Sequence, residues 1–107
     1  MAWANDKIID NQLMEADVTS EIVDMKNIYM VEAYFTYTDT PTGVIQMEFS
    51  TNGIDWIIPT GASKALNGSS GSFMIDYIDT PTRYMRLKYV FSSGTGTLNA
   101  WFSSKGV

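Results

Sequence analysis

Apolar and polar residues alternate along most of this chain, which is the period of a β-strand with one buried face. The alternation is clearest from residue 44 to residue 58, VIQMEFSTNGIDWII. Asn52-Gly53 interrupts it with the dipeptide that most favours a tight hairpin turn. The pattern therefore predicts two strands, at 44–50 and 54–58, with Trp56 in the core.

Further stretches show the same period between clusters of turn residues, at 18–24, 28–38, 73–78, 83–92 and 97–104. The tetrapeptide DTPT occurs twice between these stretches, at 39–42 and at 79–82, and predicts a turn at each place. SGTG at 93–96 predicts a hairpin turn. Residues 59–72 are rich in glycine and serine and predict a loop. The fold class expected is all-β: a two-sheet antiparallel β-sandwich, jelly-roll-like, with seven or eight strands.

The first residues lack this regularity. Apolar residues within 1–16 are irregularly spaced, which fits either a short helical turn or an extended arm lying on a neighbouring molecule. We favour the arm. The expected organisation is an N-terminal arm at 1–16 and a β-sandwich domain at 17–107.

Two segments of the chain share a pattern. GVIQMEFSTNG at 43–53 resembles GTLNAWFSSKG at 96–106. Each belongs to a strand–turn–strand unit, one at 31–50 and the other at 86–103. A sandwich built from two related units predicts such a repetition.

The stretch 28–38 has two apolar faces, whereas a strand of an isolated sandwich should have one wet face. One of its faces carries Met30 and Tyr34, which suggests burial under a loop or against another subunit. Trp101 falls on the polar face of its strand and fits a subunit contact, a sugar-stacking platform or a partly covered surface position. We place subunit contact first, because large aromatic residues are enriched in interface cores. Trp3 could anchor the arm on a neighbour.

Composition removes several kinds of chemistry. The sequence contains neither histidine nor cysteine. A standard catalytic triad, a zinc site with thiolate ligands and a disulfide bond are therefore excluded. No phosphate-binding loop occurs, and scattered acids such as Asp39 and Asp79 fit solvated turns better than an acid/base pair or a calcium site. We expect no catalytic residues, no cofactor and no metal.

Charge and hydropathy bear on partners. The formal net charge is −5 without a basic run, which argues against nucleic acid as a partner. No apolar run is long enough to span a bilayer, and no secretory signal is visible.

A charge pair between strands is also predicted. Glu48 on one strand and Arg86 or Lys88 on another are candidates for a cross-strand pair that fixes the register of the two strands.

Several short motifs resemble known β-sandwiches. VIQMEFSTNGIDW and RYMRLKY resemble strands of discoidin-like, galactose-binding-type domains. The order of motifs resembles more closely that of small bacteriophage virion structural proteins, with TSEIVD at 19–24, IY at 28–29, TPTG at 40–43, STNGIDW at 50–56, and GTGTLN at 94–99 followed by KG at 105–106. Asn52 replaces the usual aspartate of the turn, and Val23 the usual isoleucine.

The resemblance implies a non-enzymatic virion component that acts by self-association, as a homotrimer, and by binding other virion proteins. The resemblance suggests that the protein decorates or cements the capsid, or that it belongs to a vertex or a fibre. Its synthesis would take place in the cytoplasm of the bacterial host. The alternative is a carbohydrate-binding module of discoidin-like type that uses Trp101 and nearby loops. A sugar ligand is thus conceivable but not expected.

Overall fold

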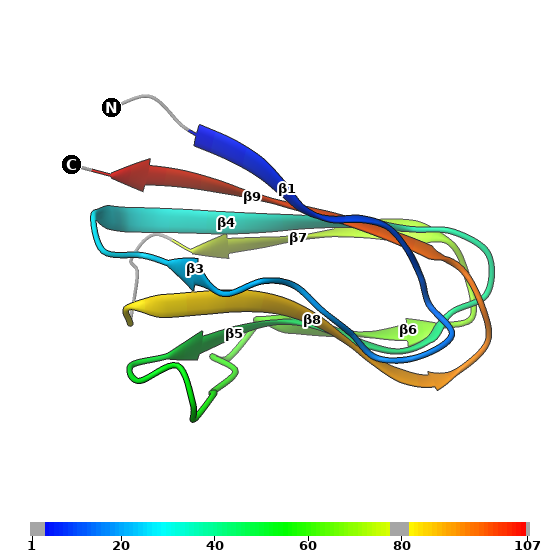
Figure 1. Cartoon of the computed structure of the whole chain (residues 1–107). Coiled ribbons are helices and arrows are strands. Elements are labelled where there is room, and N and C mark those ends of the chain that lie inside the picture. The colour runs from blue at the N-terminus through cyan, green and yellow to red at the C-terminus, as the bar shows by residue number, and fades with distance from the viewer. Residues whose placement is uncertain (1–3, 78–81, 107) are drawn as a thin grey trace.

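The structure, a computed structural model, is an antiparallel β-sandwich and describes residues 4–77 and 82–106 (Figure 1). One sheet has four strands in the order β1 (Ala4–Leu13), β9 (Thr97–Gly106), β4 (Ile28–Tyr37) and β7 (Gly71–Tyr77). The other has five: β2 (Val18–Thr19), β8 (Tyr84–Ser93), β5 (Thr42–Ser50) and β6 (Ser63–Asn67) in that order, with β3 (Val23–Asp24) also paired to β8. The expected all-β sandwich class is confirmed.

The core lies between the two sheets and is filled by every second residue of the long strands. In β4 the buried positions are Val31, Ala33, Phe35 and Tyr37, and β9 and β8 alternate in the same way. Burial of these side chains is the main stabilising contribution. Residues 28–37 therefore turn one of their two apolar faces into the core.

Within the described residues four chain crossings join the sheets at one end of the sandwich, and two of these are in direct contact. The segment after β4 leads into β5, and the segment after β8 leads into β9, each passing from one sheet to the other. The crossings lie side by side, since the Thr40 amide donates to the Thr95 carbonyl at 3.0 Å. Residues 93–96 thus form a crossing and not the predicted hairpin, because β8 and β9 belong to different sheets.

The similarity between residues 43–53 and 96–106 has a counterpart in the pairing of the strands. The unit β4–β5 and the unit β8–β9 are matched crosswise: β4 pairs with β9 in one sheet, and β5 with β8 in the other. Exchanging the two units leaves this pattern of pairs unchanged. The sandwich is built around two similar arches, as the repetition predicts.

Nine described strands replace the seven or eight expected, and three local differences, together with the additional strand β1, account for the change. Residues 54–58 form no strand; only Ile57 bridges to Phe49, and Ile54 is 78% exposed. The segment 63–67, predicted within a loop, is β6, paired along β5. The single strand expected at 18–24 is divided into β2 and β3, both on β8.

The first part of the chain is also a strand. Residues Ala4–Leu13 form β1, hydrogen-bonded along β9 at the edge of the four-stranded sheet. The ladder is interrupted between Lys7 and Ile9 and again before Gln12, which matches the irregular spacing of apolar residues there. The division of the chain into an arm at 1–16 and a domain at 17–107 stays a prediction.

Candidate functional site

The residues predicted as contact positions converge on the outer face of the four-stranded sheet. Met30 and Tyr34 come from β4 and Trp101 from β9, and all three point away from the core because their neighbours in each strand are the buried ones. Trp3 lies outside the described residues. The alternation of the sequence thus placed three separate side chains on one surface.

Strand register assembles a continuous row across this face. Trp101 stands opposite Tyr34 on one side and Lys7 on the other, and Tyr34 in turn stands opposite Met74 of β7. We call Lys7, Trp101, Tyr34 and Met74 the aromatic row. It spans all four strands of the sheet.

The two rings in the row touch. Their centroids are 5.7 Å apart with planes inclined at 37°, within the range of favourable aromatic pairs. The Lys7 ammonium lies 5.0 Å from the centre of the Trp101 ring, in the geometry of a cation–π contact. These contacts hold the large side chains in place before any partner arrives.

Much of the row remains in water. Tyr34 is 40% exposed and Met74 is 53% exposed, while Met30 and Trp101 are half-buried. Large apolar groups gathered on an exposed sheet face mark an interaction surface more often than isolated ones do. Four strands of this length give a face on the order of 600 Å², close to the roughly 800 Å² that each partner contributes to a standard protein interface.

An acidic pair borders the row. Glu32 of β4 stands opposite Asp76 of β7, two residues along from Tyr34 and Met74. Burial raises the pKa of the Glu32 carboxyl above its ordinary value, and a hydrogen bond with Asp76 and the negative charge of that residue raise it further. The edge of the face toward β7 is therefore acidic, whereas the β1 edge carries Lys7.

The outer face of the other sheet is organised differently. There Arg86 Nε donates to Glu48 Oε1 at 2.6 Å, Gln46 Nε2 donates to Glu48 Oε2 at 2.6 Å, and the Arg86 guanidinium lies 4.1 Å from the centre of the Trp56 ring. The predicted pairing of Glu48 with Arg86 is confirmed by their register. The prediction that Trp56 belongs to the core is wrong, because it covers this ion pair from outside.

The residues 51–62, which carry Trp56, form a loop that lies outside β5 in Figure 1. We call it the covering loop. Under it Gln46, Glu48 and Ser50 are buried although they point away from the core. The polar cluster on this face is therefore satisfied internally, while Ile54, Ile57 and Ile58 of the covering loop itself are exposed.

The chain has no histidine or cysteine, and residues 4–77 and 82–106 contain no group of three or more acids placed to hold a metal ion. In the same residues no helix reaches the length and apolar character needed to cross a bilayer.

Two members of the aromatic row, Lys7 and Met74, were not predicted from the sequence. Met74 follows the alternation of its strand, but its place beside Tyr34 depends on the pairing of β7 with β4. Lys7 belongs to the segment whose strand was not predicted. Both required the register between distant strands, which no local pattern carries.

Comparison with known proteins finds similar folds. No protein-family model matches the sequence, and no curated protein matches it significantly. Among solved structures, the PBSX exported protein XepA superposes with a TM-score of 0.75 at 15% identity, over 97% of this chain and 37% of that one. The chain therefore spans little more than a third of XepA.

Other structures match over most of their length. The SPBc2 prophage-derived protein YomS superposes with a TM-score of 0.59 at 11% identity, over 96% of this chain and 94% of that one. A Bacillus endospore appendage protein superposes with a TM-score of 0.53 at 16% identity, over 98% of this chain and 88% of that one. At such identities the likeness concerns the fold, and the resemblance to β-sandwich proteins of bacteriophages is confirmed at that level.

Proposed function

We propose that this chain is a non-enzymatic structural component of a bacteriophage virion, acting through self-association and through contacts with other virion proteins. The observation that carries the proposal is the exposed aromatic row on an otherwise well-packed sheet. The folds of XepA and YomS support a phage setting. The absence of histidine and cysteine from the sequence supports a role without catalysis.

In this proposal the outer face of the four-stranded sheet is the self-contact, and a homotrimer is the expected assembly. Burying Tyr34 and Met74 against a second copy would remove apolar surface from water at roughly 25 cal/mol per Å². The protein would decorate or cement a capsid, or belong to a vertex or fibre, after synthesis in the host cytoplasm. Contacts with other virion proteins would use surface left free by the trimer.

Carbohydrate binding through Trp101 is less well supported. A sugar ring stacks on a free aromatic face, and the Lys7 ammonium already covers one face of the Trp101 ring. Tyr34 packs against the same indole. The ring is thus engaged with its neighbours in the row.

Light scattering coupled to gel filtration tests the proposal. The wild-type chain should elute with the mass of an oligomer, and Tyr34→Glu should shift the mass toward the monomer, because a carboxylate buried in the contact would lose its hydration. Ile54→Glu is the matched control, since Ile54 is an exposed apolar residue of the covering loop, away from this face. A wild-type monomer at the highest soluble concentration would overturn the proposal, as would an oligomer unaffected by Tyr34→Glu.

A further inference from the structure

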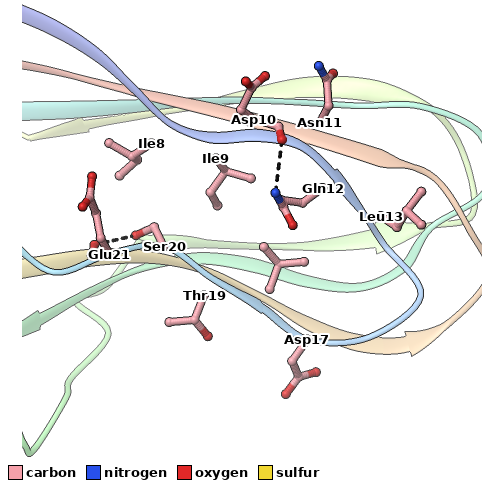
Figure 2. A pocket seen from close by; sticks show the side chains of 11 residues that line it. Ile8, Ile9, Asp10, Asn11, Gln12, Leu13, Asp17, Thr19, Ser20 and Glu21 are labelled. Carbon is pink, nitrogen blue, oxygen red and sulfur yellow. Dashed lines mark hydrogen bonds between the residues drawn. The ribbon is translucent and has the colours of Figure 1, made fainter.

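A groove runs along the open side of the sandwich, where the edge of one sheet faces the edge of the other. Its walls are β1 and the segment from residue 17 to residue 23 (Figure 2). The larger section has a volume of about 650 Å³, and a second section of about 370 Å³ shares Ile8 and Glu21 with it and reaches Phe102. Together they form one channel that follows the direction of the strands.

Both walls are edge strands. Within the described residues β1 pairs only with β9, and β2 ends the order of the five-stranded sheet. An edge strand directs every second N–H and C=O group away from its partner, where an added extended chain can pair with it. A segment in extended conformation is thus the occupant whose backbone suits this groove.

The groove also offers apolar contacts. Figure 2 shows Ile8 and Ile9 between β1 and the segment that carries Ser20. Leu13 is 63% exposed, and Ile22 in the second section is 50% exposed. An occupant with apolar side chains at alternate positions would cover Ile8, Leu13 and Ile22, whereas Ile9 already belongs to the core.

Charge decides the kind of occupant. Four acids line the two sections: Asp6, Asp10, Asp17 and Glu21. The one cation among the described lining residues is Lys7, and its Nζ is bonded to Asp10 at 2.9 Å. A second copy of this chain has no basic run to offer to these acids. Electrostatic complementarity therefore requires a basic partner.

We propose that this groove binds an extended segment of a different protein, in which lysine or arginine alternates with apolar residues. The apolar side chains of the segment face Ile8 and Ile22, and its cations face Asp17 and Glu21, because Asp10 is already paired with Lys7. The site meets the aromatic row at Lys7, whereas Trp101, Tyr34 and Met74 lie on the outer face of the four-stranded sheet, outside the groove.

A fluorescent peptide of about eight residues, a common strand length, in which lysine and valine alternate, is the probe. Its anisotropy should rise on titration with the protein at low salt, and the affinity should fall as salt is added. A peptide of glutamate and valine with the same spacing should bind at least about tenfold more weakly. Absence of binding by the lysine peptide, or equal binding of both peptides, would overturn the proposal.

A pair of variants places the site. Glu21→Lys, at an exposed position on the groove wall, should weaken the lysine peptide at least about tenfold, while Asp55→Lys, the same charge change in the covering loop, should leave the affinity unchanged. Equal losses in the two variants would show a general charge effect and reject the groove. Far-ultraviolet circular dichroism identical to wild type confirms that each variant is folded.

Discussion

Glu48 and Arg86 face each other across β5 and β8, and their side chains form an ion pair that is almost closed to water. The Nε–Oε1 distance is 2.6 Å, and the two side chains are 8% and 21% exposed. Gln46 and the Trp56 ring complete the enclosure. On the outer face of a sheet such a pair exists only because the covering loop excludes solvent.

Removing one partner should therefore be costly. Arg86→Ala leaves the Glu48 carboxylate under the covering loop without a cation, with the Gln46 amide still donating to it, and an unpaired buried charge costs several kcal/mol. Since Arg86 is partly exposed, we expect a loss of about 2–3 kcal/mol in the free energy of unfolding, measured by urea denaturation.

Arg83→Ala is the matched control. Arg83 pairs with Asp24 at 3.2 Å, but the two side chains are 54% and 48% exposed. Pairs that are this open to water contribute little to stability, so the loss should be much smaller than in Arg86→Ala. Equal losses in the two variants would show that the covering loop does not shield the Glu48–Arg86 pair.

The side-by-side crossings make a second prediction, at Gly94. Its φ is 84°, and a Cβ there would lie 2.0 Å from the Thr40 carbonyl oxygen. Gly61 has a similar φ of 83° but open space around it. Gly61→Ala should cost about 1–2 kcal/mol from backbone strain alone, and Gly94→Ala about 1–3 kcal/mol more, because the neighbouring crossing must move. Thermal unfolding of both variants measures the difference, and equal costs would contradict this packing of the crossings.

The sequence predicted the long strands because burial sets their period. Residues 28–38, 44–50, 83–92 and 97–104 alternate around one core, and the structure has strands at each of them. The same logic put Met30, Tyr34 and Trp101 on the opposite face. Periodicity gives the face of a residue but not its neighbours in the next strand.

Two wrong predictions of secondary structure, at 54–58 and at 63–67, have the same cause. In both segments the conformation is determined by contacts with other parts of the fold. Alternation at 54–58 serves to cover a polar cluster, so Trp56 stacks on Arg86 outside the sandwich. The strand β6 has the composition of a loop and is held by its ladder with β5. Tertiary context overrides local propensity in both cases.

Acidity should affect stability through Glu32. A carboxyl whose pKa is raised in the folded state binds its proton more tightly there, so stability falls as pH rises from the ordinary glutamate value to the raised one, and stays lower above it. Glu32→Gln removes this penalty. We expect the variant to gain up to about 1 kcal/mol over wild type at neutral pH, given solvent screening, and to lose that advantage in acid. Urea unfolding at both pH values measures it; an advantage independent of pH would contradict the assignment.

One hydroxyl adds to the backbone hydrogen bonds that hold the edge formed by β2 and β3 on β8. Ser20 Oγ accepts a hydrogen bond from the Leu87 amide at 2.8 Å and donates to the Glu21 carbonyl at 3.0 Å, at a residue only 8% exposed. Ser20→Ala leaves the Leu87 amide without this acceptor in a buried site, which should cost about 1–3 kcal/mol.

Ser72→Ala is the comparison, because Ser72 is an exposed residue of β7 and should change stability by less than about 0.5 kcal/mol. Hydrogen exchange gives a local readout: the Leu87 amide should lose protection in Ser20→Ala. Because Ser20 also lines the groove, the variant should loosen the wall opposite β1 and weaken the lysine peptide as well. Full protection of Leu87 in the variant would mean that the backbone alone holds this edge on β8.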